Sequence, residues 1–148
     1  MNDFEYMHLA IVQAQAAALR GEVPVGAVVV LEDRILAAAG NRTITDCDPT
    51  AHAEIVALRE AARKAGNHRL IGTSLYVTVE PCAMCAGALV QARVARLIYG
   101  ADEPKGGAVR TCMQVLDAPA INHRVEVVSG VLAGESVQLL QSFFSTRR

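Results

Sequence analysis

Residues 75–85 read Leu75-Tyr76-Val77-Thr78-Val79-Glu80-Pro81-Cys82-Ala83-Met84-Cys85, an apolar run that leads through a proline into two cysteines. A short apolar run that stops at a proline is typical of a buried strand. Proline suits the beginning of a helix, and residues three apart lie on one helix face. The stretch therefore predicts a strand over residues 75–79 that delivers Cys82 and Cys85 together to the next helix.

A histidine and a glutamate stand upstream in His52-Ala53-Glu54. Residues two apart on a helix point about 200° apart, so both side chains can serve a metal only if it lies off the helix end. Asp48-Pro49-Thr50 is a good helix start, which predicts Thr50 as the N-cap and places His52 and Glu54 in the first turn. Two helix N-termini, with free N–H groups and positive dipole ends, would then face one metal.

One imidazole and two thiolates, from His52, Cys82 and Cys85, form a ligand set that Zn²⁺ favours. Three protein ligands leave the fourth tetrahedral position open, as in a catalytic zinc site. Glu54 supplies the carboxylate that a zinc-bound water needs as a proton acceptor and donor. The pattern predicts a hydrolytic zinc site with Glu54 as the general acid and base.

Two other interpretations of the cysteines remain. A structural zinc would need a fourth protein ligand, for which Cys47 is the nearby candidate, but this reading leaves Glu54 without a role. A redox Cys-x-x-Cys pair would not need the upstream His-x-Glu. The catalytic zinc is favoured over both.

The rest of the chain predicts one domain over residues 1–148. In it a hairpin opens an otherwise largely parallel, and so mixed, sheet of five strands with helices on both faces. Apolar residues at helical spacing indicate a first helix, from Asn2 or Asp3 to Gly21, and a closing helix. Their apolar positions are Phe4, Met7, Ile11, Ala14 and Ala18 in the first, and Val137, Leu140 and Phe144 in the last. Further strands are expected at residues 25–31, 34–39, 96–100 and 125–128. The helix that follows the Thr50 cap is expected to end at Gly66-Asn67, and a short helix is expected near 111–116.

The composition sets limits on partners and location. A net charge of −1 over 148 residues argues against a strongly electrostatic nucleic-acid binder, and zero tryptophans with 4% aromatic residues give no broad stacking platform. Any RNA contact must therefore use local positive charge, for which the candidates are Arg42, Lys105, Arg110, Arg124, Arg147 and Arg148. No apolar run is long enough for a membrane span and no leader is recognised, so we expect no membrane association and a cytoplasmic protein. Four cysteines, two of them assigned to metal, are too few for a disulfide framework.

His-Ala-Glu followed by Pro-Cys-x-x-Cys is the known signature of the zinc-dependent nucleoside and nucleobase deaminases. Other segments resemble one branch of this cytidine/deoxycytidylate deaminase superfamily, the bacterial tRNA-specific adenosine deaminases, over nearly the whole chain. They are Val23-Pro24-Val25-Gly26-Ala27-Val28, Asn41-Arg42, Asp48-Pro49-Thr50-Ala51, Pro104-Lys105-Gly106-Gly107, Asn122-His123-Arg124 and Phe143-Phe144-Ser145-Thr146-Arg147-Arg148.

The resemblance implies a three-layer α/β/α cytidine-deaminase-like fold, one Zn²⁺ per subunit and a homodimer. It implies hydrolytic deamination of adenosine to inosine at the wobble position (34) of a tRNA anticodon, with tRNA-Arg as the expected substrate and Glu54 as the proton shuttle. The anticodon stem-loop would be the partner. By the same resemblance, the substrate-binding residues are Asn41 and Ala53 at the base, Val23 and Pro24 in the pocket wall, and Glu103, Lys105, Asn122, Arg124 and Phe144.

This chain departs from the family at Glu103, where relatives commonly carry aspartate. In the family that acid approaches the ribose beside the target base, and a contact to the 2′-hydroxyl distinguishes RNA from DNA.

Two alternative functions share the metal site. A deaminase of free nucleobases or nucleosides, of the guanine or cytosine type, would carry the same His52, Glu54, Cys82 and Cys85, but not the tRNA-branch segments. A non-catalytic, zinc-stabilised binding module would not need Glu54.

Overall fold

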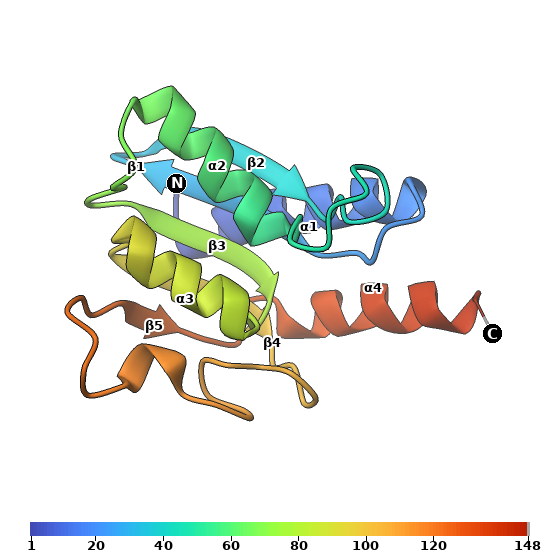
Figure 1. The fold of residues 1–148 in the computed structure, drawn as a ribbon. Coiled ribbons are helices and arrows are strands. Elements are labelled where there is room, and N and C mark those ends of the chain that lie inside the picture. Colours follow the sequence, from blue (N-terminus) through green and yellow to red (C-terminus); the bar gives the residue numbers. More distant parts are fainter. Residues whose placement is uncertain (148) are drawn as a thin grey trace.

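Five strands form one mixed sheet in the computed structural model, which describes residues 1–147 (Figure 1). Its spatial order is β2-β1-β3-β4-β5. The strands are β1 (Gly26–Leu31), β2 (Arg34–Gly40), β3 (Ser74–Val79), β4 (Arg96–Ala101) and β5 (Glu126–Val128). The predicted five-stranded sheet is confirmed.

The pairing directions confirm a mixed sheet that a hairpin opens. β1 is antiparallel to both β2 and β3, while β3, β4 and β5 are parallel to one another. After β2 the chain crosses over β1 and adds β3 on the other side of it. β1 therefore lies between β2 and β3, which run in the same direction. A hairpin strand between two strands of one direction must be antiparallel to both.

Helices cover both faces of the sheet, which confirms the three-layer fold. α2 (Ala53–Ala65) and α3 (Ala83–Ala92) lie on one face, and α1 (Asp3–Leu19) and α4 (Ala133–Ser145) lie on the other (Figure 1). Alternate strand residues fill the two layers: Val29 and Val77 pack in the cluster under α2 and α3, whereas Val28 and Tyr76 pack under α1. This is the period of two that a pleated strand imposes.

α1 buries a face slightly rotated from the predicted one. Met7, Ile11 and Ala14 are buried as expected, but Phe4 is 60% exposed and Tyr6 takes its place in the core. The Tyr6 ring lies 5.2 Å from that of Tyr76 on β3, a contact that the helical spacing alone could not reveal. An Asn2–Glu5 capping box begins the helix.

The N-cap of α2 is His52, and the prediction of Thr50 was wrong. Both the N–H and the hydroxyl of Thr50 donate to Asp48 Oδ1, at 2.8 and 2.7 Å, so Thr50 belongs to a turn before the helix. The first turn therefore begins at Ala53, directly after the histidine.

Residues 102–122 form the predicted long connection, but the helix expected near 111–116 is reduced to a 3₁₀ turn, η1 (Val115–Asp117). The N–H groups of Cys112 and Val115 donate to the carbonyls of Gly107 and Ala108, at 2.9 and 3.0 Å. These carbonyls lie five and seven residues earlier, so the bonds to the fourth residue back that define an α-helix are not made here. Among residues 1–147, no helix combines the length and apolar composition needed to cross a bilayer.

Candidate metal centre and active site

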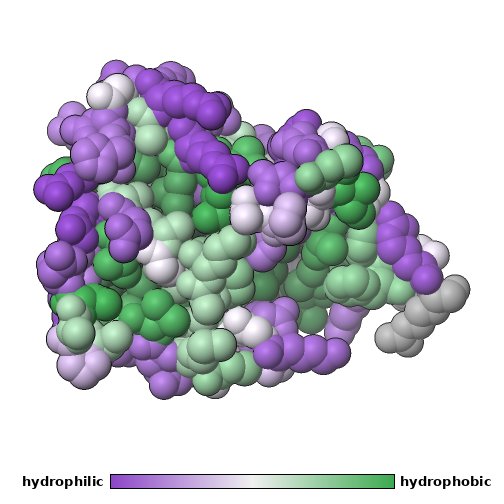
Figure 2. All heavy atoms as spheres, viewed as in Figure 1, coloured by the Kyte–Doolittle hydropathy of each residue, from purple (hydrophilic) through white to green (hydrophobic). Residues whose placement is uncertain are grey.

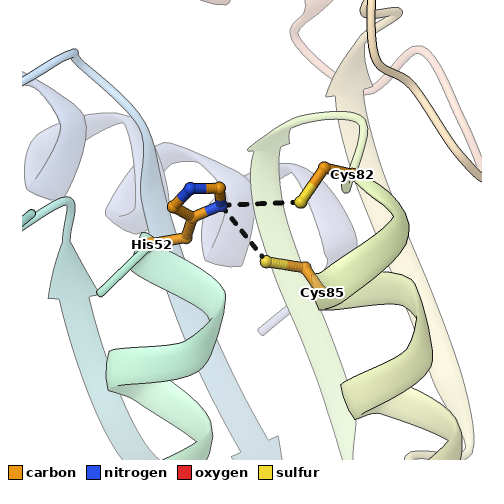
Figure 3. Close-up of side chains that lie close together, drawn as sticks. All are labelled: His52, Cys82 and Cys85. Atoms are coloured by element: carbon orange, nitrogen blue, oxygen red, sulfur yellow. Dashed lines mark hydrogen bonds between the residues drawn. The ribbon is translucent and has the colours of Figure 1, made fainter. Parts of the chain in front are cut away.

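His52, Cys82 and Cys85 converge at one point between α2 and α3 (Figure 3). The Nδ1 atom of His52 lies 3.6 Å from Cys82 Sγ and 3.5 Å from Cys85 Sγ. Tetrahedral zinc at usual bond lengths separates a nitrogen ligand from a sulfur ligand by roughly 3.6 Å. Both the donor set and its spacing therefore fit a zinc ion.

The backbone brings this group together through two helix beginnings. His52 is the N-cap of α2, and Cys82 is the N-cap of α3 with Cys85 in its first turn. Both N-cap residues have extended backbones, at φ −65°, ψ 154° and φ −75°, ψ 178°. The positive ends of two helix dipoles consequently face the three ligands and stabilise negative charge there.

Contact between the two cysteines shifts their pKa values in opposite directions. A hydrogen bond from Cys85, helped by the neighbouring His52, lowers the pKa of Cys82 to about 3. Contact with Cys82, together with burial, raises the pKa of Cys85. Because metal ligation requires thiolates, binding of a zinc ion would displace the proton of Cys85.

Cys47 stands apart from the group that could hold a metal in the described chain. It is exposed, and its Sγ atom lies 3.8 Å from the carbonyl of Ile44. A closed site with Cys47 as the fourth ligand therefore finds no support in this arrangement.

Glu54 lies in the first turn of α2 and is only 4% exposed. Burial raises the pKa of Glu54, while positive charge on His52 acts against this increase. A carboxyl group with a raised pKa holds a proton more readily than an exposed one, which suits a general acid and base.

Asn41 is held against the same helix beginning. Its Oδ1 atom accepts a hydrogen bond of 2.9 Å from the N–H of Ala53. Ala53 was predicted to meet the base, but in this structure its N–H binds Asn41. With the oxygen engaged, the amide NH₂ of Asn41 is the group that remains to meet a ligand.

Val23 and Pro24 precede β1, at the end of the sheet where α2 begins. Pro24 is buried and Val23 half-buried. The Asn41 N–H donates to the carbonyl of the adjacent Val25 at 3.1 Å, which joins this segment to the loop before α2. The predicted pocket wall is thus next to Asn41.

Two buried carboxylates escaped the sequence analysis. Glu22 is fully buried and accepts hydrogen bonds from the N–H groups of Ile44 and Thr45 and from the hydroxyls of Thr43 and Thr45. Glu80 is 3% exposed and binds the loop after β4 in the same manner. The available signal was a glutamate directly before each proline-containing segment, Glu22-Val23-Pro24 and Glu80-Pro81.

Hydrogen bonds keep both glutamates ionised. Burial alone would raise the pKa of Glu80, but donors from Arg110, Thr111 and Glu103 outweigh it and lower the pKa to about 2. For Glu22, burial is likewise outweighed by hydrogen bonds from residues 43–45, and its pKa lies below the usual 4.5. Each carboxylate therefore acts as a charged centre around which a loop is built.

Glu103 and Lys105 lie on the loop that Glu80 holds. Lys105 is exposed, and Glu103 is half-buried. Oε1 of Glu103 accepts a 2.8 Å hydrogen bond from the Lys105 N–H, so this carboxylate shapes its own turn. Arg42, another candidate cation, is bound by both carboxylate oxygens of Asp46, at 3.0–3.2 Å.

Asn122 and Arg124 are not brought to the metal centre. Asn122 accepts a hydrogen bond of 3.1 Å from Arg93, the C-cap of α3, and Cys82 lies at the opposite end of that helix, roughly 15 Å away. Arg124 donates to the carbonyls of Leu116 and Ala118, at 3.3 and 3.1 Å. Within one subunit these two residues brace the 102–122 connection.

The closing helix extends beyond the body of the sheet at the side where α2 and α3 begin (Figure 1). On it Phe143 is buried, while Phe144 is 48% exposed. The Arg147 guanidinium stacks over Phe143, 3.9 Å from the ring centre, and lies beside Gly21, just before Val23. Arg148 lies outside the described residues.

Comparisons with known proteins agree with this geometry. The model of the MafB19-like deaminase family matches residues 1–148. A tRNA-specific adenosine deaminase of Agrobacterium fabrum is 48% identical over 97% of this chain and 94% of its own, and that of Haemophilus influenzae is 47% identical over 99% and 85%.

Solved structures give the same result. One from a study of A-to-I editing by tRNA:A34 deaminases at the wobble position is 48% identical and superposes with a TM-score of 0.90, over 92% of this chain and 99% of the other. A guanine deaminase from Bacillus subtilis is 31% identical with a TM-score of 0.69, over 99% and 94%.

Proposed function

We propose a specific reaction for this chain, which belongs to the tRNA-specific adenosine deaminases. It deaminates adenosine to inosine by hydrolysis at the wobble position (34) of the anticodon of tRNA-Arg. Water replaces the 6-amino group of the adenine, and ammonia leaves. The observation that carries the proposal is the open group of His52, Cys82 and Cys85 with the buried carboxylate of Glu54 one residue beyond Ala53.

His52, Cys82 and Cys85 would hold one zinc ion per subunit. Zinc, when bound there, supplies Lewis-acid activation of a water molecule. Glu54 takes a proton from the attacking water at its carboxylate and returns it to the leaving amino group. The low exposure of Glu54 keeps bulk water from competing for this proton.

Asn41 positions the base. Because its oxygen is bound to the Ala53 N–H, its NH₂ group donates toward the pocket, where a purine ring nitrogen can accept. Val23 and Pro24 form the apolar wall beside it.

RNA outside the target base meets exposed groups on two segments. Lys105 and Arg110 are exposed on the loop after β4, and Phe144 is exposed on α4, where an aromatic ring can stack on a base. Glu103 is the candidate contact to a ribose hydroxyl. Two further candidates, Asn122 and Arg124, are remote from the metal centre of their own subunit. They would contact RNA only if the bound RNA extends along α3, or if it is bound at the metal centre of a partner subunit.

A homodimer is the proposed assembly, and its interface is the apolar groove between α2 and α3. Figure 2 shows hydrophobic residues gathered between these two helices. The groove is lined mainly by apolar side chains, among them Ile55, Leu58, Ala62, Ala88 and Ala92. A second copy would cover this surface, and the protein would work in the cytoplasm, where tRNA is found.

A free-base deaminase is the second candidate, favoured by the likeness to the guanine deaminase of Bacillus subtilis. The two functions share the metal ligands and Glu54, so only the substrate separates them. A non-catalytic zinc-binding module is disfavoured by the buried Glu54, which such a module would not need.

An inosine assay tests these proposals. Purified protein is incubated with an unmodified tRNA-Arg transcript that carries adenosine at position 34, and in parallel with free adenosine, guanine and cytidine. We expect inosine at that one position, lost in Glu54→Ala. Deamination of a free base without editing would establish the second candidate, and no reaction with any substrate would support the binding module.

A further inference from the structure

Glu80 follows β3 and precedes the metal-ligand helix α3 in the chain, and its carboxylate accepts five hydrogen bonds from the loop after β4. Oε2 accepts from the N–H groups of Val109, Arg110 and Thr111, at 3.0, 2.8 and 3.0 Å. Oε1 accepts from the N–H of Glu103 at 3.1 Å and from the hydroxyl of Thr111. Residues 103–111, which we term the substrate loop, are thus folded around one buried anion.

The contact between Glu80 and the substrate loop is close. A Cβ atom at Gly107 would overlap the Glu80 carboxylate, so only glycine allows the loop to approach this far. The Ala108 N–H also donates to the carbonyl of Pro81 at 2.9 Å, one residue before the metal ligand Cys82. With the backbone amides turned inward, Lys105 and Arg110 remain exposed.

We propose that Glu80 is a positioning residue, which fixes the substrate loop relative to Cys82. Lys105 and Arg110 would thereby be held in a fixed position to bind RNA phosphates. The metal ligands and Glu54 would meanwhile act on the base. This inference rests on the proposed function. Its physical basis is preorganisation, because a loop already held in its binding conformation loses less entropy when RNA binds.

A purely structural role makes a different prediction. If Glu80 only stabilised the fold, its loss would lower the melting temperature and leave the kinetics of the folded enzyme unchanged. If it positions the loop for RNA, the folded variant must bind RNA more weakly while the chemical step, carried by His52, Glu54 and the cysteines, proceeds at its usual rate.

Glu80→Gln is the decisive variant. The glutamine amide has one accepting oxygen and one donating NH₂ group. Both carboxylate oxygens of Glu80 accept backbone N–H groups, so in either orientation of the amide its NH₂ would face an N–H donor. We expect one zinc per chain to be retained and the amides of residues 109–111 to lose hydrogen-exchange protection. KM for the tRNA-Arg stem-loop should rise about tenfold or more, the scale of a lost hydrogen bond to a charged group, with kcat nearly unchanged.

Two further variants complete the test. Thr111→Val removes only the hydroxyl donor and keeps the carboxylate with its backbone partners, so it should fold and raise KM in the same direction by less. It carries the test if Glu80→Gln does not fold. Glu22→Gln is the matched control, because Glu22 is a second buried carboxylate. This variant should lose hydrogen-exchange protection at the amides of Ile44 and Thr45 but keep it at residues 109–111.

The outcomes separate the two proposals. A folded Glu80→Gln enzyme with unchanged KM, or with residues 109–111 still protected, overturns the positioning role. An equal loss of protection at 109–111 in Glu22→Gln also overturns it, because the effect would then be general. If the wild-type chain does not edit the stem-loop, the proposed function has failed, and the exchange data alone then decide whether Glu80 holds the loop.

Discussion

The side-chain oxygen of Asn41 accepts the backbone N–H of Ala53 at 2.9 Å, directly between the metal ligand His52 and Glu54. This bond occupies the first free amide of α2 and sets the direction of the Asn41 amide. Asn41 thus caps the helix through its oxygen, and the proposed contact to the base would use its NH₂ group.

Asn41→Asp separates them, because it keeps the oxygen and replaces only the NH₂ group. We expect kcat/KM for the stem-loop to fall about 30-fold or more, since the ring nitrogen of the base would face an acceptor. The melting temperature should stay close to that of the wild type. Asn41→Ala, as the comparison, should lose activity and also about 1 kcal/mol of stability. An Asn41→Asp enzyme with normal kcat/KM would show that the NH₂ does not contact the base.

Glu54→Gln should abolish turnover without loss of metal. The amide keeps the shape of the side chain but cannot take a proton, so we expect kcat to fall by about 10²–10⁴. Zinc content, measured by elemental analysis, should remain one per chain. Turnover within tenfold of the wild type would remove Glu54 from its proposed role.

Zinc binding should release protons, because contact with Cys82 and burial raise the pKa of Cys85 and keep it a thiol. Titration of chelator-treated protein with zinc in weak buffer should release at least one proton per zinc. Cys85→Ala should lose tight zinc binding, while Cys47→Ser, altered at an exposed cysteine outside the group, should bind one zinc as before. Loss of zinc in Cys47→Ser would revive the closed four-ligand site.

Glu22 should make stability depend on pH in the acid range. Burial raises its pKa, but hydrogen bonds from residues 43–45 prevail, and the folded pKa lies below the unfolded value of 4.5. A depressed pKa stabilises the fold fully above about 4.5, and this contribution is lost as pH falls through the folded pKa. Urea unfolding from pH 7 to 3 should show a steeper acid decline for the wild type than for Glu22→Gln. Parallel pH profiles would contradict this account.

Phe143 and Phe144 should respond differently to substitution. Phe143 is 9% exposed and lies on the buried face of α4, so Phe143→Ala should cost about 3 kcal/mol in unfolding free energy. Phe144 is 48% exposed, so Phe144→Ala should leave stability within about 0.5 kcal/mol and raise KM for RNA through a lost stacking contact. Chemical denaturation and stem-loop kinetics measure the two effects. An unchanged KM in Phe144→Ala would exclude stacking on this ring.

Much of the fold could be predicted because its signals are local. The apolar run at residues 75–79 became β3, and the hairpin predicted at Glu32-Asp33 formed with both residues at positive φ, 50° and 60°, as a tight two-residue turn requires. The prediction failed where contacts outside the helical pattern replaced it. Near 111–116 only the 3₁₀ turn η1 forms, because the N–H groups of Cys112 and Val115 donate to Gly107 and Ala108 and not to the fourth residue back.

The chemistry of the site was contained in the sequence itself. One imidazole and two thiolates bind zinc because of their residue types alone. The His-x-Glu and Cys-x-x-Cys spacings fix the relative positions of these side chains over no more than about one helix turn. Only the tertiary structure decided which loops surround that chemistry. Glu22 and Glu80 bind amides more than twenty residues away, and Asn41 takes an N–H that the sequence left free. Such bonds depend on how separate segments pass one another, and no local pattern of residues encodes that.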